Sequence, residues 1–501
     1  MVTPQSTNGH RDSVDCVVVG AGPAGCTAAT LIAMQGHKVT LLERETTPKY
    51  KIGESLLPAT IHGICPLLGV SEEIKKANFI LKHGGTFRWG KNPNPWVFDF
   101  ASSQKMAGPT STAYQVERVV FDRILLENAR KKGVSVRVGC KVTGTLEEDG
   151  RVAGLTFLNE QGDAETIRAK YVVDGAGHES PLARKVGERI FSKYFQNIAV
   201  FGYFENGGRL PPPLSGNIFC AAFDEGWFWY IPLRKELTSV GVVIDKSKAG
   251  ELTNDLPASL ARYIEKCKPI KDLLKDATRV TEGIYGEVRA RKDYSYANTK
   301  FWIPGLALIG DSACFVDPVF SSGVHLATYS GLQVARSVNT YLRGGKANEV
   351  AIFDEFEKRY RREYANFYDF LLAFYNVEQE ETSYFWEAKK VLGAKTPEDE
   401  AFINLVGGVG NNNEELFDAA AFFEQRAELG DTLFPEAAAE PVAPAAGGER
   451  GEFYRKLTSE ITAMQINSLL GSKRPLEQPL FEDGLVPTRD GMHWAVAAAK
   501  A

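Results

Sequence analysis

The order of apolar and polar positions predicts a strand, a helix and a second strand near the start of the chain. An apolar run ends at Val19, and a glycine turn, a stretch of small and apolar residues, Gly36 and a second apolar run, VTLLE, follow it. Short apolar runs bounded by glycine are typical of buried strands, and small residues between them suit a helix that packs on a sheet. The stretch from Asp15 to Glu43 therefore predicts a βαβ unit.

Further along the chain the pattern predicts more strands and then helices. Strand-like stretches at 134–138, 152–158, 227–231 and 239–244, several bounded by glycine or proline, suggest a second sheet. Between residues 326 and 390 apolar positions recur three and four residues apart, which is typical of helices. These positions are Phe353, Phe356, Tyr360, Tyr364, Phe367 and Leu371.

The predicted fold class is α/β, with a Rossmann-like nucleotide-binding domain interleaved with a mixed-sheet substrate domain. Residues 1–330 would hold both, with the second sheet formed by about 80–115 and 190–300. A helical layer over 331–432 would follow. The segment PEAAAEPVAPAAGG, within 433–450, cannot bury enough apolar surface to offset the entropy of ordering, so we expect a flexible linker. Residues 451–501 would form a terminal segment.

Composition excludes some classes of protein. The 501 residues carry a net charge of −5 with 44% hydrophobic and 24% charged residues, so we expect an ordinary globular chain and no nucleic-acid partner. The seven cysteines are scattered without metal-ligand spacing, which predicts free thiols and no metal site. The polar start lacks the apolar core of a signal peptide, and no stretch approaches the ~20 apolar residues of a membrane span. We therefore expect a cytoplasmic protein that does not enter a membrane.

The glycine turn carries the first chemical signal. Gly20-x-Gly22-x-x-Gly25 follows the first strand and opens the helix. In this setting the first glycine permits the turn, the second lets the backbone approach a pyrophosphate, and the third lets helix and strand pack closely. Glu43, at the end of the second strand, suits a ribose diol and would repel a 2′-phosphate. The motif predicts binding of FAD or NAD but not NADP.

Two later strands end in Asp174-Gly-Ala-Gly177 and Gly310-Asp311. With the βαβ unit upstream, this pattern resembles the glutathione-reductase-like flavoprotein superfamily, which implies that Asp311 and Arg118 contact FAD. Aromatic hydroxylases of that superfamily carry Asp-Gly-x-x-Ser, which serves FAD and NADPH, but aligned on Ser180 this chain has Ala-Gly instead. Because no second G-x-G-x-x-G is present, we expect reduced flavin (FADH2) to come from a separate flavin reductase.

The run Gly226-Trp-Phe-Trp-Tyr-Ile-Pro232 resembles the W-x-W-x-I-P signature of flavin-dependent halogenases. Trp227 and Trp229 are two residues apart on a predicted strand, so their side chains share a face. Taken in isolation, the run would be interpreted as two aromatic residues of the core. The resemblance implies that they and Pro232 lie near the path between the flavin and the substrate. There the bulk of the tryptophans would block ordinary monooxygenation.

The same resemblance implies a site at which FADH2 and O2 oxidise chloride. Lys82 falls at the family's active-site lysine, which holds the resulting hypochlorous acid beside one ring carbon. Lys75 and Lys76 are nearby competitors, but their SEEIKK context predicts an exposed helix face.

The run from Asp317 to His325 resembles the segment beside the flavin ring. Ser322 and Gly323 would be amide donors to the halide, next to Pro318, Phe320 and Ser321, at a helix start that Gly323 opens. A helix start without a ligand is equally compatible with these residues alone, and we assign His325 to packing.

The stretch from Lys51 to Gly63 adds a likeness to halogenases of phenolic or pyrrole rings on carrier proteins, above all the tyrosyl halogenases of glycopeptide-antibiotic and related biosynthetic pathways. The tryptophan-halogenase branch has a catalytic glutamate beside this lysine, Lys82 here, and no residue of this sequence is assigned to that place. The resemblance therefore favours a phenol, whose own oxygen activates the ring. The likeness implies a tyrosine derivative on a peptidyl carrier protein.

A basic cluster, Lys358, Arg359, Arg361 and Arg362, is predicted to form a rim that steers an acidic carrier. On charge alone, a solvated face paired with Glu355, Glu357 and Glu363 is the alternative. For the whole chain the alternatives are an aromatic monooxygenase of the same fold and a flavin-binding assembly-line protein without chemistry.

Overall fold

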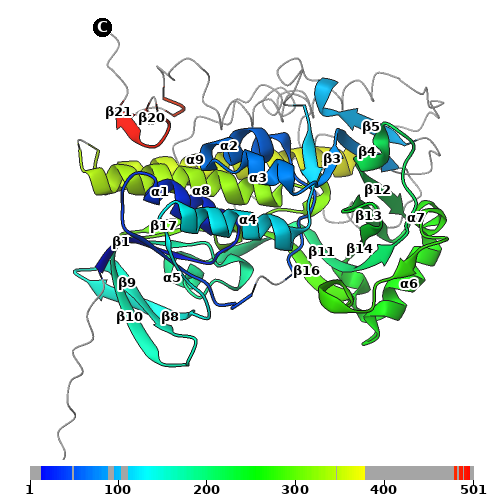
Figure 1. Cartoon of the computed structure of the whole chain (residues 1–501), viewed down its shortest axis with the longest axis horizontal. Coiled ribbons are helices and arrows are strands. Elements are labelled where there is room, and N and C mark those ends of the chain that lie inside the picture. Colours follow the sequence, from blue (N-terminus) through cyan, green and yellow to red (C-terminus); the bar gives the residue numbers. More distant parts are fainter. Residues whose placement is uncertain are drawn as a thin grey trace, which may run out of the picture.

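The structure is a computed structural model of the chain that describes residues 13–47, 50–88, 95–102, 111–345, 347–377, 479–481, 484–488 and 490–496. Two sheets lie at the two ends of the molecule in Figure 1, and long helices run across both. The predicted α/β class is thus confirmed.

The first sheet is mostly parallel. Its strand order is β17 (Trp302–Ile303), β18 (Leu306–Leu308), β10 (Ala164–Asp174), β1 (Ser13–Val19), β2 (Val39–Leu42) and β7 (Ser135–Arg137). The hairpin strands β8 (Lys141–Glu148) and β9 (Arg151–Leu158) extend β10 antiparallel. From β1 the chain continues to β2 on one side, whereas β10 joins on the other. Ligands bind in such sheets outside the carboxyl ends of the strands where the order reverses, so this crevice is the expected nucleotide site.

The second sheet is mixed and joins segments that are far apart in the sequence. Its order is β19 (Cys314–Phe315), β16 (Arg289–Asn298), β11 (Arg189–Glu205), β14 (Leu237–Asp245), β13 (Gly226–Pro232), β12 (Ile218–Phe223), β4 (Gly84–Arg88) and β5 (Trp96–Asp99), with β15 (Thr278–Arg279) on β11. Separate two-stranded pairs are β3 (Ile80–Lys82) with β6 (Ala113–Gln115), and β20 (Leu485–Pro487) with β21 (Trp494–Val496).

Side chains alternate across the second sheet because successive residues of a strand point to opposite faces. Trp227 and Trp229 join the core shared with the first sheet, whereas Phe228 and Tyr230 pack in a separate core with α6 (Leu256–Lys266) and α7 (Lys268–Leu273). In Figure 1 these two helices cover the outer side of the sheet. The signature strand is therefore buried on both faces.

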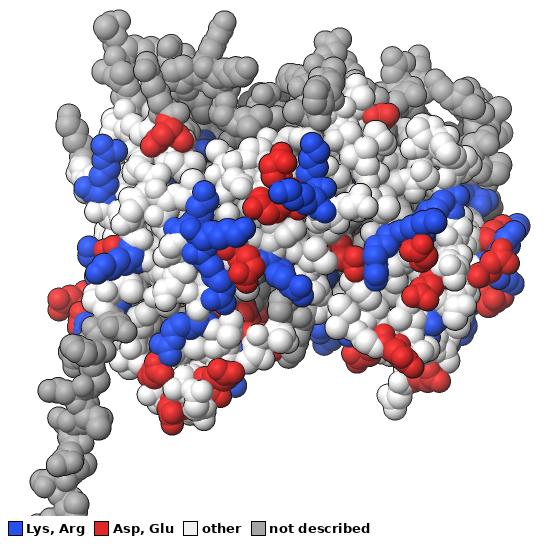
Figure 2. All heavy atoms as spheres, viewed as in Figure 1, with Lys and Arg blue, Asp and Glu red and all other residues white. Residues whose placement is uncertain are grey.

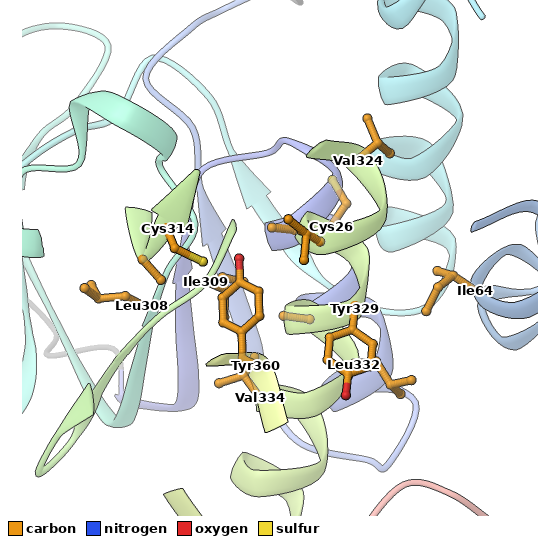
Figure 3. Packing of buried hydrophobic residues seen from close by; sticks show 14 of the residues in the cluster. Cys26, Ile64, Leu308, Ile309, Cys314, Val324, Tyr329, Leu332, Val334 and Tyr360 are labelled. Carbon is orange, nitrogen blue, oxygen red and sulfur yellow. The ribbon is translucent and has the colours of Figure 1, made fainter. Parts of the chain in front are cut away.

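The other helices connect and cover the sheets. They are α1 (Pro23–Ala33), α2 (Cys65–Leu68), α3 (Ser71–Lys76), α4 (Arg118–Lys131), α5 (Ala183–Val186), α8 (Gly323–Arg343) and α9 (Glu349–Val377). A π-helical turn, Ala59–Ile64, precedes α2. Helices α1 and α8 approach closely at Gly331, where an added Cβ would lie 2.7 Å from the carbonyl oxygen of Ala24. Figure 3 shows the core at this contact, with Cys26 of α1 facing residues of α8.

Two of the stretches assigned to a second sheet belong to the first. Residues 134–138 contain β7, which pairs with β2, and residues 152–158 lie in β9, which pairs with β10. The strand prediction is correct but the sheet assignment is wrong. Alternation of apolar residues shows that a strand has a buried face, yet it does not show which strand lies beside it.

The helices α8 and α9 overlap the described part of the predicted helical layer, and the aromatic positions that predicted it are buried. The basic rim is wrong. Arg359 and Arg361 are 5% and 4% exposed and form ion pairs with Glu355 and Glu357 one turn earlier. Distant segments of the chain cover both guanidinium groups, which also donate to the carbonyls of Leu485 and Asn298, so each buried charge needed a partner. Glu363 is buried too, which also rules out the predicted solvated face.

The hairpin of β20 and β21 packs on α8 and α9 through buried polar contacts. The guanidinium of Arg359 donates to the Leu485 carbonyl at 3.0 Å, and Leu485 N donates to Glu355 at 3.0 Å. The indole of Trp494 donates to Ser337 Oγ on α8 at 2.9 Å. The Glu355–Arg359 pair therefore ties the terminal segment to the helical layer.

Glu355→Ala is expected to destabilise the protein by about 3–5 kcal/mol, because it leaves the buried Arg359 guanidinium without its carboxylate. Lys358→Ala, one residue before Arg359 but exposed, is the matched control and should change the free energy of unfolding by less than about 0.5 kcal/mol. Chemical denaturation measures both. Equal effects of the two substitutions would contradict the role of the pair.

The predicted linker and residues 378–432 of the predicted helical layer lie outside the described residues. The seven cysteines are buried free thiols, as predicted. Within the described ranges, no group of His, Cys, Asp and Glu is arranged to hold a metal ion, and no helix has the length and apolar character needed to span a membrane. Figure 2 shows positive and negative side chains interspersed over the visible face.

Candidate functional site

The glycine turn closes at the end of β1 for steric reasons. Gly20 has φ +90°, and a Cβ there would lie 2.6 Å from the Gly175 carbonyl oxygen after β10. A Cβ on Gly25 would lie 1.9 Å from the Gly20 carbonyl oxygen, whereas one on Gly22 would meet nothing within 4 Å. Gly20 and Gly25 are thus required to close the turn, whereas Gly22 faces open space at the start of α1.

Glu43 supports this turn from the end of β2. Its Oε2 accepts the Ala21 amide at 2.6 Å and its Oε1 accepts the Glu45 amide at 2.9 Å. Each carboxylate oxygen retains a lone pair for a further hydrogen bond. The side chain is therefore compatible with the predicted ribose contact, and it has a structural task that the motif did not reveal.

Asp311 follows β18 at the same edge of the sheet. Its side chain is 36% exposed, and Oδ2 lies 3.1 Å from Nδ1 of His178. The turn before it is held from the helices, because Gly310 N donates to Ser330 Oγ at 2.9 Å and the Tyr360 hydroxyl donates to the Gly310 carbonyl at 3.2 Å. In Figure 3 Tyr360 lies beside Cys314 and Ile309. The helical layer thus presents an open carboxylate to the crevice.

Asp174, by contrast, is fully buried, and burial raises its pKa. It accepts the Ala176 amide at 2.9 Å and the Ser180 hydroxyl, and Ser312 Oγ donates to it at 3.2 Å. The carboxylate therefore organises the turn after β10 and is withdrawn from solvent. Its partner Ser180 is the residue on which the missing hydroxylase motif was aligned.

Arg118 begins α4 and is buried against an ion-pair partner. Its Nε donates to Asp122 at 2.9 Å and its Nη2 donates to the other oxygen of Asp122 at 3.0 Å. Nη1 donates to the Ile52 carbonyl at 2.5 Å. Arg118 therefore fixes the segment before residue 54, and any contact with FAD would add to these bonds.

These features fit a dinucleotide. The first turn of α1 leaves amide groups without helical acceptors, and the Gly22 position is open beside it. Pyrophosphate would lie at that helix start, with Glu43 and Asp311 at the same edge of the sheet. The chemistry of the donor set thus suits FAD.

The signature strand β13 places its tryptophans in a row across the second sheet. Trp229 lies opposite Cys220 of β12 and opposite Gly241 of β14. A Cβ on Gly241 would lie 2.2 Å from the indole of Trp229, so this glycine makes room for the ring. The two indoles are buried with centroids 6.3 Å apart, and Trp229 Nε1 donates to Ser239 Oγ at 3.1 Å.

Lys82 ends β3 and is 1% exposed. Its Nζ donates to Ser55 Oγ at 2.8 Å and to the Leu56 carbonyl at 3.0 Å, and it lies 5.5 Å from the Phe100 ring centroid. Burial lowers the pKa of Lys82 to about 7. Lys75 and Lys76 are exposed on α3, as their sequence context predicted. Lys82 therefore has a substantial neutral fraction near pH 7.

The segment after β19 forms a fixed loop. Pro318–Phe320 is a 3-10 turn, Ser321 has φ +61°, and α8 begins at Gly323 as expected. Ser322 is fully buried, and its Oγ makes no hydrogen bond within the described structure. A Cβ on Gly323 would meet nothing within 4 Å. A buried hydroxyl, an open position and a helix start are thus compatible with a small anion.

Asp317 anchors this loop, and sequence reasoning gave it no such role. It accepts Asn197 Nδ2 of β11 at 2.9 Å, the Val319 amide at 3.1 Å and the Tyr375 hydroxyl of α9 at 3.2 Å. An Asp before a 3-10 turn is a recognisable capping signal, but its distant partners are visible only in the fold. His325 is buried with Nε2 2.7 Å from Glu363 Oε1, which agrees with its assignment to packing.

The structure joins several of these residues into one region. Cys220 lies opposite Phe87 and Trp229 in neighbouring strands, and it interacts electrostatically with Lys82. The Phe87 ring meets Phe320, in the loop after β19, with centroids 5.9 Å apart. Cys220 and Phe87, on the neighbouring strands β12 and β4, therefore link Lys82, Trp229 and the loop, while Pro232 lies at the end of β13.

Comparison with known proteins finds similarity to halogenases over most of the chain. The family described as tryptophan halogenase matches residues 15–109 and 102–445. A tryptophan 2-halogenase of Chondromyces crocatus is 34% identical over 412 residues, 79% of this chain and 76% of that protein. The flavin-dependent halogenase armH3 of Armillaria mellea is 31% identical over 397 residues, 75% of this chain and 77% of that protein.

Solved structures agree. The myxobacterial chondrochloren halogenase CndH, an FAD-dependent halogenase, superposes with a TM-score of 0.76 at 46% identity, covering 97% of this chain and all of that one. The flavin-dependent halogenase CmlS superposes with a TM-score of 0.72 at 29% identity, over 97% of this chain and 84% of that one. With its dinucleotide crevice and its buried lysine and tryptophans, the chain belongs to the family of flavin-dependent halogenases, enzymes that use FADH2, O2 and halide.

Proposed function

We propose that the enzyme chlorinates a phenolic, tyrosine-derived ring, with Lys82 as the residue that delivers chlorine. The observation that carries the proposal is the amine of Lys82, which is buried, held by Ser55 and Leu56, and has a pKa of about 7. When bound, FADH2 and O2 supply the two-electron oxidation of chloride to hypochlorous acid. Gly20, Gly22, Gly25, Glu43, Arg118 and Asp311 would hold the cofactor, and Ser322 and Gly323 the halide.

Lys82 acts on hypochlorous acid through its nitrogen. The neutral amine can accept hydrogen bonding from the acid, or take up its chlorine with loss of water, since a free electron pair is the nucleophile. A ring carbon then takes the chlorine and loses a proton, which returns the amine. The buried position keeps the oxidant away from water, and Ser55 and Leu56 hold the nitrogen in one place.

The phenolic substrate is supported by the immediate partners of Lys82. In the part of the chain that the structure describes, its hydrogen bonds go to a hydroxyl and a backbone carbonyl and not to a carboxylate. A ring whose own oxygen activates the attacked carbon needs the least help from such a group. Chlorination is expected ortho to the phenol.

The predicted basic rim no longer supports a carrier-bound substrate. Arg359 and Arg361 are buried in internal ion pairs, and of the four cations only Lys358 is exposed while Arg362 is half-buried. The proposed substrate is therefore the phenol itself, and tyrosine on a peptidyl carrier protein is the contrasting arm of the experiment.

The test is product analysis by mass spectrometry with FADH2, O2 and chloride. Free tyrosine-derived phenols, carrier-loaded tyrosine and free tryptophan are compared, with bromide in a parallel series. Ortho-chlorinated free phenol is expected. Chlorination of tryptophan alone, or of carrier-loaded tyrosine alone, would contradict the proposal, and hydroxylated product would favour the aromatic monooxygenase alternative.

The enzyme alone is expected not to oxidise NADH or NADPH, because the described structure has one glycine turn of the dinucleotide type and the chain has no second such motif. Adding a flavin reductase with FAD and NADH should start halogenation. Absorbance at 340 nm follows the reaction. Reductase-independent oxidation at a comparable rate would refute the two-component arrangement.

A further inference from the structure

Glu54, a buried carboxyl that directly precedes the two hydrogen-bond acceptors of Lys82 in the sequence, has no part in the chemistry described above. Glu54 is 1% exposed and lies in the segment 50–57. Its backbone carbonyl accepts the Val116 amide at 2.7 Å, and Ser55 forms a bridge with Gln115. The next two residues, Ser55 and Leu56, are the hydrogen-bond acceptors of Lys82 Nζ. Glu54 is therefore the neighbour of the groups that position the amine.

The side chain of Glu54 is held by the second sheet. The Tyr203 hydroxyl donates to its Oε1 at 2.6 Å, and the Tyr50 hydroxyl lies at 3.5 Å. Tyr203 of β11 pairs directly with Ser239 of β14. Ser239 also accepts the indole N–H of Trp229 at 3.1 Å. Tyr203 therefore holds the Glu54 carboxyl, and its neighbour on the sheet, Ser239, holds the indole of Trp229.

The surroundings of Glu54 favour a carboxyl that is protonated for much of the time near neutral pH. Burial raises its pKa to about 7, against hydrogen bonding by Ser239, Tyr203 and Tyr50 and the charge of Arg118, which lower it. The ring of Tyr285 packs on the ring of Tyr203, with centroids 4.5 Å apart. A glutamine at this position would match the protonated acid in shape and keep an acceptor for Tyr203.

We propose that Glu54 is a positioning residue of the halogenation site, which pins the 50–57 segment to Tyr203 and so holds Ser55 and Leu56 where they orient Lys82. The inference rests on the proposed role of Lys82. Without the Glu54 carboxyl, the segment keeps its backbone pairing to residues 114–116 but loses its tie to the sheet that carries the tryptophans. The amine then has more than one position, and hypochlorous acid reaches water before it reaches the ring.

The experiment measures halogenated product per FADH2 consumed. Glu54→Ala is expected to lower this ratio at least about tenfold, as misplacement of a reactive group does, with FADH2 consumption near that of the wild type. Glu54→Gln should retain most of the ratio. Tyr203→Phe should lower it, and adding Tyr203→Phe to Glu54→Ala should have little further effect, because the two side chains act through one contact.

Two further measurements separate positioning from general damage. Glu355→Gln removes the charge of a buried carboxyl in the ion pair with Arg359, and it should lower stability without lowering product per FADH2. Hydrogen exchange at the amides of residues 55–57 should quicken in Glu54→Ala and stay slow in Glu54→Gln. The exchange measurement does not depend on which substrate is used.

Several results would overturn the inference. One is an unchanged ratio in Glu54→Ala while Lys82→Met forms no product. Loss of FADH2 consumption together with product would place Glu54 in cofactor binding instead. If Lys82→Met retains product, the proposed function fails, and the exchange result alone then decides the inference, with unchanged exchange in Glu54→Ala counting against it.

Discussion

Lys82→Met is expected to consume FADH2 and oxygen at the wild-type rate while halogenated product falls at least about a hundredfold, the scale expected when a positioned reactive group is lost. Methionine has a similar length but no amine, so the cavity remains filled while the chlorine acceptor is gone. Oxidation of chloride would continue, and hypochlorous acid would escape to solution. Stopped-flow absorbance follows the cofactor, and mass spectrometry measures the product.

Lys75→Met is the matched control for this variant, because Lys75 is exposed on α3 only seven positions earlier. It should change neither measurement. Wild-type yields of product from Lys82→Met would remove this lysine from the proposed mechanism. A parallel loss of cofactor consumption and product would instead assign Lys82 to the flavin step.

The stability of the same variant has a defined pH dependence. The folded-state pKa of Lys82, about 7, lies below its value in the unfolded chain, near 10.4, so the unfolded state binds more protons between these values. For this group the free energy of unfolding rises with pH from about 7 toward 10.4, and the burial penalty is fully present below pH 7. Lys82→Met should remove that rise and be more stable than the wild type at low pH. Chemical denaturation across this range measures both effects.

The second large effect is expected at the glycine turn. Gly25→Ala places a Cβ 1.9 Å from the Gly20 carbonyl oxygen, which is backbone and has little freedom to move. The cofactor-free protein should lose about 1–3 kcal/mol of stability or more, and FAD binding should be lost with the turn. Gly22→Ala, whose Cβ meets nothing within 4 Å, should leave the cofactor-free stability unchanged.

For Gly22→Ala, FAD affinity alone should fall, on the order of tenfold to a hundredfold, because a methyl group would stand where the pyrophosphate approaches. Thermal unfolding without cofactor and isothermal titration with FAD separate the two effects. Gly250→Ala, also in open space but on the second-sheet side, is the control and should change neither. An unaltered FAD affinity in Gly22→Ala would move the pyrophosphate away from this helix start.

Membership in the halogenase family decides between the enzyme and the flavin-binding protein without chemistry, in favour of the enzyme. The motifs that led there were short and local. A glycine turn, a W-x-W strand and a helix start depend on backbone geometry over a few residues, so their residue types are visible in the sequence itself. The βαβ unit, the start of α8 at Gly323 and the buried aromatic face of α9 were predictable for that reason.

Contacts between distant segments were not predictable. The strands β7 and β9 have the alternation of any half-buried strand, and pairing with β2 and β10 assigned them to the first sheet. Arg359 and Arg361 were predicted to form a charged rim, because the sequence shows the spacing of charges but not which segments bury them. The fold supplied Glu355, Glu357 and the Leu485 carbonyl, and burial followed.

The sequence by itself determined the fold class and the glycine turn, and it singled out Lys82 as a candidate, since these depend on local periodicity and on residue types with special backbone or chemical properties. Only the tertiary structure decided how Lys82 is held by Ser55, and it brought Tyr203 to Glu54 across 149 positions of the chain. The physical reason is that desolvation and hydrogen bonding depend on what surrounds a group in space. Spacing along a chain carries no record of that surrounding until the chain has folded.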